Sequence, residues 1–182
     1  MKLLYWNARG VANASTCQVI ARMVRSHHPF MLCLLEPFVS LSSIKPSMWR
    51  ALRLFPVATN DRGSQEPNLW LLCHVDVTPI VLSVTNQQLT VSCILDSVSC
   101  TIAYVCAKTT VVARHQLWYD LAYVKSFFVN GPWAIIGDFN CVLGAYVYAN
   151  SCSEFQMMSS VCELVHLPTK GLSYTRGCGV HR

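Results

Sequence analysis

The sequence predicts a mixed α/β sandwich, in which two layers of mixed β-sheet are flanked by helices. Strand-like and helix-like segments alternate at both ends of the chain. Between them, residues 54–106 contain a series of short apolar runs separated by polar residues, which is typical of antiparallel strands. Alternation favours parallel strands and the central series favours antiparallel ones, so the combination predicts sheets of mixed direction.

The N-terminal third is predicted to fold as strand, helix and strand. Residues 1–5 form a short apolar strand that ends at Trp6 and Asn7. Residues 13–15 can cap a helix that ends before Pro29 and carries apolar residues on one face, namely Val19, Ile20, Met23 and Val24. The run MLCLLEP at 31–37 is too short for a core helix, so we expect a buried strand that ends on Glu36.

The rest of the chain is predicted as a meander followed by helix, strand and helix. The runs at 69–73, 80–84, 89–95 and 100–106 have the composition of strands and predict an antiparallel meander. Apolar residues spaced by four, three and four mark an amphipathic helix over 113–128: Leu117, Leu121, Val124 and Phe128. WAIIG at 133–137 is a buried strand, and Ser153 with Gln156 forms a capping box that starts a last helix.

Composition limits the class of protein. The 182 residues suit a single domain, 1–182, and 53% are hydrophobic while only 13% are charged. No apolar run approaches the roughly 18 residues of a membrane span, and the first residues turn polar too early for a signal peptide, so an intracellular location is expected. The ten cysteines include no CxxC pair, which favours reduced, buried thiols over a zinc site.

Three polar residues follow predicted buried strands, although the chain contains only nine acidic residues. Asn7, Glu36 and Asp138 each lie at the carboxyl end of a strand, where ligands bind in α/β sheets. Carboxylate and amide oxygens suit Mg²⁺, and Asn140 would point the same way as Asp138 in an extended segment. The alternative is ordinary turn chemistry, because Asp-x-Asn after glycine readily bonds its own backbone.

Other polar residues give weaker indications. The histidines at 74, 115 and 166 are isolated and accompany no nucleophile motif, and nothing indicates a small-molecule cofactor. The net charge of +5 is compatible with a polyanionic partner, but no basic run localises it. Four basic residues lie in predicted loops or at element ends, where we expect them to be solvated, with phosphate contacts as the alternative: Arg9, Arg62, Lys108 and Arg114.

The series LLYWNARG, LLEP, GPWAIIGDFN and LVHLPTKGLSYT resembles the endonuclease domain of plant LINE-type (non-LTR) retrotransposons. These enzymes belong to the endonuclease/exonuclease/phosphatase superfamily, and the resemblance covers nearly the whole chain in order. It implies a DNase I-like sandwich that nicks DNA by hydrolysis dependent on Mg²⁺, with Mn²⁺ as the alternative cation. It also implies a nuclear location and a DNA partner, and we expect a monomer.

The resemblance also assigns roles to individual residues. Asn7 and Glu36 would belong to the metal site, Asp138 would position and activate the attacking water, and Asn140 would bond the phosphoryl oxygens. Cys106 stands where the family has a phosphate-contacting tyrosine, and Arg176 stands where it favours tryptophan.

The chain also lacks the closing Ser-Asp-His motif of the family, so its last strands are expected to be missing and its activity impaired. The alternative is a non-catalytic remnant with at most weak nucleic-acid binding. A phosphatase of the same superfamily has no distinguishing residue here.

Overall fold

The chain folds into twelve helices and strands and one short 3₁₀ turn within the part that the structure describes. The computed structural model describes residues 2–141, 149–165 and 167. The elements are Leu3–Asn7 (β1), Ala14–His27 (α1), Met31–Leu35 (β2), Leu41–Ser43 (the 3₁₀ turn), Pro46–Ala51 (α2), Leu54–Thr59 (β3), Leu69–His74 (β4), Ile80–Val84 (β5), Gln88–Leu95 (β6), Val98–Cys106 (β7), Val111–Phe128 (α3), Trp133–Asp138 (β8) and Ala149–Val161 (α4).

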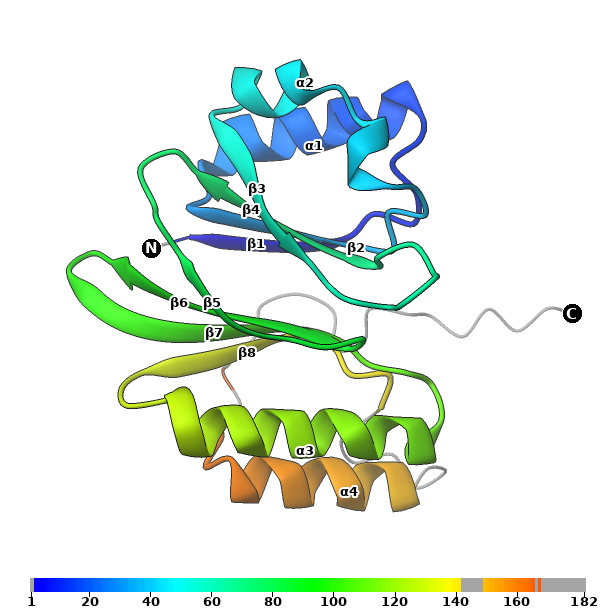
Figure 1. Ribbon diagram of the computed structural model, residues 1–182, viewed down its shortest axis with the longest axis vertical. Coiled ribbons are helices and arrows are strands. Elements are labelled where there is room, and N and C mark those ends of the chain that lie inside the picture. Colours follow the sequence, from blue (N-terminus) through cyan, green and yellow to red (C-terminus); the bar gives the residue numbers. More distant parts are fainter. Residues whose placement is uncertain (1, 142–148, 166, 168–182) are drawn as a thin grey trace, which may run out of the picture.

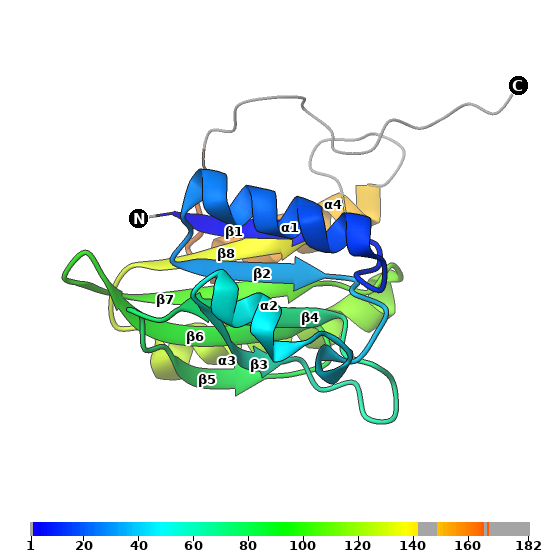
Figure 2. The same ribbon diagram turned by 90° about the horizontal axis from the view of Figure 1, so that it is seen from above.

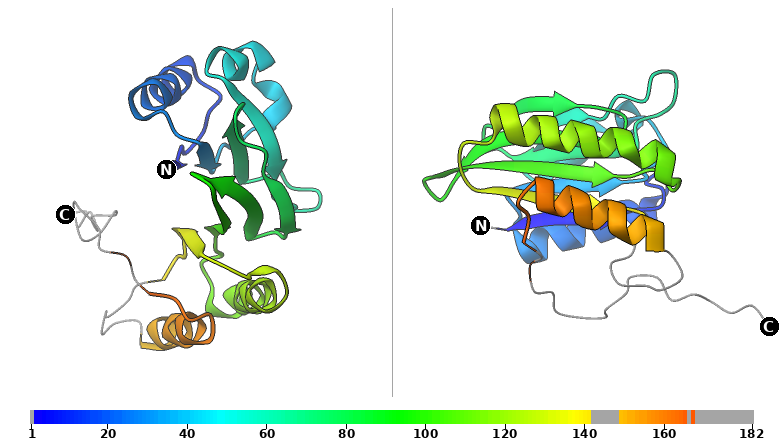
Figure 3. Two further views of the ribbon diagram at one scale, coloured as in Figure 1. Left: turned by 90° about the vertical axis from the view of Figure 1, so that its left-hand side faces the viewer. Right: turned by 90° about the horizontal axis from the view of Figure 1, so that it is seen from below.

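Two β-sheets pack face to face, and helices cover both outer faces. The first sheet has the strand order β1-β2-β4-β3 and the second has the order β5-β6-β7-β8. Figure 1 shows α1 and α2 over the first sheet and α3 and α4 over the second, and Figure 3 shows the same layers from the side. The predicted two-layered mixed sandwich is therefore confirmed.

Both sheets combine parallel and antiparallel pairs. β1 runs parallel to β2, and β7 runs parallel to β8. The pairs β2–β4, β3–β4, β5–β6 and β6–β7 are antiparallel. Each parallel pair brings two carboxyl ends of strands together at one edge of its sheet.

The core follows the two-residue period of the strands. On β2, the side chains of Met31, Cys33 and Leu35 enter the layer between the sheets, whereas Leu32 and Leu34 pack toward the first pair of helices. β7 behaves alike, with Ile102, Tyr104 and Cys106 between the sheets and Ala103 and Val105 toward α3 and α4. Both faces of these central strands are buried, which explains their continuous apolar runs in the sequence.

Several expected elements differ from those observed. The strands of residues 54–106 do not form one meander, because β3 and β4 belong to the first sheet while β5, β6 and β7 belong to the second. Asn13 does cap α1, and its Oδ1 accepts from the Thr16 amide at 2.7 Å. The expected capping box is wrong, because α4 begins at Ala149 and Ser153 lies within the helix. The 3₁₀ turn and α2 had no clear signal in the sequence.

Candidate functional site

The parallel pair β1–β2 places the first two candidate residues at one edge of the first sheet. Asn7 is the last residue of β1 and lies in register with Leu35, so Glu36 follows immediately on the neighbouring strand. The amide of Ala8 donates to the carbonyl of Leu35 at 2.9 Å, and the amide of Gly10 donates to that of Glu36 at 2.8 Å. These bonds hold the segments after both strands side by side.

The parallel pair β7–β8 places the other candidates at the corresponding edge of the second sheet. Asp138 is the last residue of β8 and lies in register with Cys106. The amide of Ala107 donates to the Asp138 carbonyl at 2.8 Å. Gly137 is required here, because an added Cβ would lie 2.4 Å from the Val105 carbonyl oxygen.

The Tyr5 hydroxyl connects these two edges. It donates to the Val105 carbonyl at 2.7 Å and accepts from the Asp138 amide at 2.8 Å. Burial raises the pKa of this hydroxyl, so it stays protonated and continues to donate. Figure 2 shows β1 and β8, which are the outer strands of their two sheets, on the same side of the sandwich. The bond network therefore fixes the strand that carries Asn7 against the strand that carries Asp138.

The segment after Asp138 is held by its own side chains. The amide of Asn140 donates to Asp138 Oδ1 at 3.0 Å, and Asn140 Nδ2 donates to the Ala107 carbonyl at 2.5 Å. The turn chemistry considered from the sequence is therefore present, and it also orients the Asp138 carboxylate. An amide group carries two hydrogens, so the bond to Ala107 leaves the second hydrogen of Asn140 for a ligand.

The backbone at this end of the sandwich is strained. Glu36 has φ of 49° and Asn140 has φ of 49°, and both lie in the left-handed region. Asparagine tolerates this conformation better than glutamate does. Such residues cost about 1–3 kcal/mol each and occur often at functional sites, which makes Glu36 the more informative of the two.

Cys106, the buried Asn60 and the partly exposed Asn68 form a polar cluster beside these residues. Asn68 Nδ2 donates to Cys106 Sγ at 3.3 Å, and Asn60 Nδ2 donates to Asn68 Oδ1 at 2.7 Å. The pKa of the Cys106 thiol is raised to about 12, mainly by burial and then by the charges of Glu36 and Asp138, while Arg62 acts in the opposite direction. Both carboxylates and the Arg62 guanidinium therefore lie within electrostatic reach of one sulfur atom.

The donor set can be compared with what a metal ion requires. The described residues contain no group of three or more His, Cys, Asp or Glu side chains that could hold a metal ion by themselves. Mg²⁺ commonly uses one or two carboxylates and keeps several water molecules or substrate oxygens. Glu36 with the amide oxygen of Asn7 fits that pattern, although Asn7 Oδ1 already accepts from the Arg9 amide at 3.2 Å. A carbonyl oxygen has a second lone pair for a cation.

Arg114 is buried beside the segment that follows Asp138, whereas the sequence predicted a solvated side chain. Its side chain is 1% exposed. Nη1 donates to the carbonyls of Thr109 at 2.8 Å and Asn140 at 3.0 Å, while Nε donates to Glu154 Oε1 at 2.9 Å. One buried guanidinium thus ties α3, α4 and the segment after Asp138 together. Its partner Glu154 lies 40 residues away in sequence, so no local sequence pattern indicated the Arg114–Glu154 ion pair.

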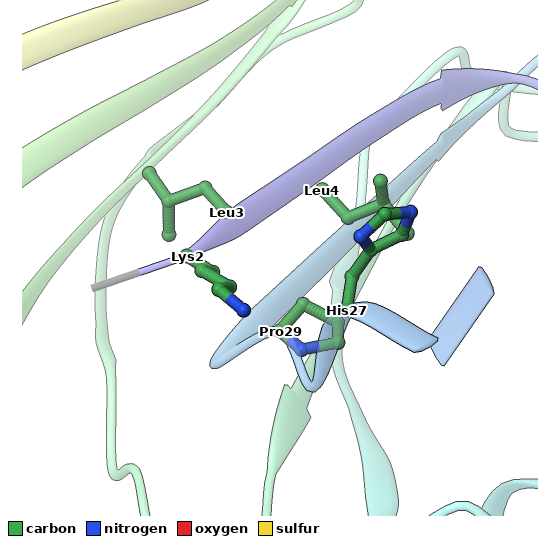
Figure 4. Close-up of a pocket in the computed structure, with 5 residues that line it drawn as sticks. All are labelled: Lys2, Leu3, Leu4, His27 and Pro29. Carbon is green, nitrogen blue, oxygen red and sulfur yellow. The ribbon is translucent and has the colours of Figure 1, made fainter. Parts of the chain in front are cut away.

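Two basic residues that follow β1 and β7 are exposed, and the described residues form a pocket at the start of β1. Arg9 and Lys108 are exposed, as expected for solvated residues. Arg176 and the segment 168–182 lie outside the described residues. A pocket of about 350 Å³ lies at the start of β1 and is lined by Lys2, Leu3, Leu4, His27 and Pro29 (Figure 4). Asn7 lies at the other end of that strand, so this pocket is separate from the candidate site.

Comparison with known proteins identifies the fold. No protein-family profile matches the chain, and no curated protein matches it. Among solved structures, the endonuclease domain of TRAS1, a telomere-specific non-LTR retrotransposon, matches with a TM-score of 0.66 and 11% identity, over 88% of this chain and 71% of that one. No helix of the described residues is long and apolar enough to cross a membrane.

Two further structures show the same likeness. An AP endonuclease from Archaeoglobus fulgidus matches with a TM-score of 0.63 and 11% identity, over 88% of this chain and 70% of that one. The 3′ phosphatase NExo from Neisseria, bound to product DNA hairpin, matches with a TM-score of 0.63 and 12% identity, over 88% and 71%. The chain therefore has the DNase I-like fold of endonuclease/exonuclease/phosphatase-type proteins.

Proposed function

We propose that this chain is a metal-dependent DNA phosphodiesterase domain of the LINE retrotransposon type, with impaired hydrolysis. The observation that carries the proposal is the Tyr5 bridge between β1 and β8, which joins the strand ending at Asn7 to the strand ending at Asp138. Glu36 follows β2 beside Asn7. The position of these amide and carboxylate groups at the ends of β1, β2 and β8, in a fold that solved nucleases share, supports the proposal.

Each candidate side chain has a distinct role in this proposal. Glu36 and Asn7 would hold Mg²⁺, or Mn²⁺ in its place, through oxygen atoms. When bound, the cation neutralises charge on the phosphate. Asp138 orients a water molecule and accepts its proton. The hydrogen bond of 3.0 Å from the Asn140 backbone amide keeps the Asp138 carboxylate in one orientation. The second hydrogen of the Asn140 side-chain amide donates to a phosphoryl oxygen.

DNA is the proposed substrate. The Neisseria phosphatase with this fold binds a product DNA hairpin, and the net charge of this chain is +5. Arg62 lies near Cys106 at the candidate site, while Arg9 follows Asn7 and Lys108 follows β7. These side chains would contact backbone phosphates without reading bases. The proposal includes a nuclear location and action as a monomer.

Cys106 favours a second candidate function, that of a non-catalytic remnant. In the family that the sequence resembles, a tyrosine at this position contacts the phosphate. A thiol is shorter and a weaker donor than a phenol, and this one already accepts from Asn68. Loss of this contact would weaken stabilisation of the phosphate in the transition state.

Nicking of supercoiled plasmid tests the two functions. We expect the purified chain to nick slowly with Mg²⁺ or Mn²⁺ and not at all with EDTA. Asp138→Asn should lower the rate by about 10²-fold or more, down to background, because a positioned general base contributes about 10²–10⁴-fold. Glu36→Gln should also lower the rate, because it removes the carboxylate charge from the proposed metal site. Asp76→Asn is the matched control, because Asp76 is an exposed acid that pairs with Arg53.

The outcomes separate the proposals. Nicking that Asp138→Asn abolishes and Asp76→Asn preserves supports the phosphodiesterase. Equal rates for wild type and Asp138→Asn overturn it and leave the remnant. In that case, a gel-shift assay at low salt shows whether the remnant still binds DNA.

A further inference from the structure

Two cysteine side chains face each other across the hairpin formed by β6 and β7. Cys93 on β6 lies in direct register with Cys100 on β7, and their sulfur atoms are 3.8 Å apart. The connecting turn consists of Asp96 and Ser97, both with positive φ, which matches a two-residue type I′ hairpin. The short turn fixes the register, so the two thiols have little freedom to move apart.

This arrangement matches the geometry that a disulfide requires. Opposed residues of an antiparallel pair have Cα atoms about 4.5 or 5.5 Å apart, depending on their hydrogen-bonding class. Disulfides form at Cα separations of about 4.4–6.8 Å, so either class suffices. The sulfur atoms need only close from 3.8 Å to bonding distance, which rotation of the side chains can supply.

We propose that Cys93 and Cys100 form a redox-reactive dithiol that a low-molecular-weight disulfide oxidises to an intramolecular disulfide. The thiolate of one cysteine attacks the reagent, forms a mixed disulfide and releases one small thiol. The second cysteine loses its proton, attacks the mixed disulfide at the protein sulfur and releases the second small thiol. The protein loses two protons and two electrons, and the reagent gains them as it is reduced to two thiols.

The surroundings of the pair indicate the order of attack. Cys93 is only 4% exposed and belongs to the core between the sheets, whereas Cys100 is partly exposed. Burial raises the pKa of the Cys93 thiol to about 12, with Cys100 as the next cause. Cys100 is therefore the thiol that meets the reagent, and Cys93 resolves the mixed disulfide.

The pair lies away from the candidate site. Cys106, at the site, is six residues farther along β7 than Cys100. An extended strand rises about 3.3 Å per residue, which separates the two by roughly 20 Å. Oxidation of the dithiol therefore reports on the hairpin itself, and its outcome is independent of whether the site hydrolyses DNA.

Peptide mapping of the full chain tests the proposal. Folded protein is incubated with glutathione disulfide, quenched with acid, alkylated and digested with a protease that cleaves before aspartate. The cuts separate residues 76–95, which contain Cys93, from 96–119, which contain Cys100 and Cys106. We expect these two fragments to be recovered as one disulfide-linked species, and dithiothreitol should separate them.

Two variants identify the bond. Cys100→Ser should abolish the linked species completely, while the matched variant Cys106→Ser should retain it. Fragment sequencing of the wild-type species locates the linked sulfurs even if a variant fails to fold. Recovery of unlinked, fully alkylated fragments from oxidised wild type overturns the proposal, and so does a bond from Cys93 to any other cysteine.

Discussion

Replacement of Arg114 by methionine tests the buried ion pair behind the site. Methionine keeps much of the side-chain length and removes the guanidinium. The change deletes the bonds to the Thr109 and Asn140 carbonyls and both bonds to Glu154, at 2.9 and 2.5 Å. The Glu154 carboxylate, only 10% exposed, is then left without its principal partner.

The expected destabilisation follows from that geometry. Breaking a buried pair by removing one partner costs about 3–5 kcal/mol, because the other charge stays buried. In a chain of this size, each kcal/mol lowers the melting temperature by about 2–4 °C, so a decrease of roughly 6–20 °C is expected. His115 Nε2 lies 3.3 Å from Glu154 Oε2 but makes no hydrogen bond to it, so it should compensate little.

Urea unfolding followed by tryptophan fluorescence measures the effect. Arg22→Met on the exposed surface of α1 is the matched control and should stay within about 0.5 kcal/mol of wild type. The double variant Arg114→Met with Glu154→Leu should recover at least half of the loss, because an apolar pair avoids the buried charge. An Arg114→Met protein as stable as the control would refute the reasoning, as would strictly additive effects in the double variant.

Three further predictions concern the stability of the fold. Gly137→Ala should destabilise the fold by about 1–3 kcal/mol in urea unfolding, because its methyl group meets the β7 backbone, whereas Gly131→Ala, with its nearest contact at 3.6 Å, should be nearly neutral. Tyr5→Phe should cost about 1–3 kcal/mol by leaving two backbone groups unpaired, while the exposed Tyr119→Phe should cost nothing measurable; equal melting temperatures for the two would contradict the bridge. Stability should fall as the pH rises from about 9 to 11, by up to about 1.4 kcal/mol per thiol per pH unit, since unfolded thiols near pKa 8.5 lose their protons first. The thiols concerned have pKa values raised by burial, to about 11 for Cys73 and about 12 for Cys93 and Cys106, and urea midpoints that stay constant over this range would exclude the effect.

The sequence predicted an element well where an uninterrupted apolar run or a single capping residue determines it. The runs at 31–35 and 69–73 are fully buried strands, and the Asn13 cap fixes the start of α1. The division of the central strands between two sheets was not predictable, because β4 and β5 follow each other in sequence yet pair with different partners. The pattern of apolar and polar residues identifies the buried face of a strand, but it does not identify the strands or helices that pack against that face.

The candidate site was predictable only in part for the same reason. Asn7, Glu36 and Asp138 were identified because strand ends can be seen in the sequence. Their assignment to metal and catalytic roles remains a prediction. Arg114 was misjudged as a solvated residue, because a single basic residue near a helix start gives no sign of a carboxylate 40 positions away.

The Tyr5 bridge has a consequence for the order in which the chain folds. Its hydroxyl bonds the Asp138 amide across 133 positions of sequence. Contacts at such separation form late, because the intervening loop must close first. During synthesis, β1 and β2 leave the ribosome long before β8 exists, so at that stage the first sheet carries Asn7 and Glu36 without Asp138. A nascent chain therefore cannot hold the complete arrangement until its eighth strand has docked.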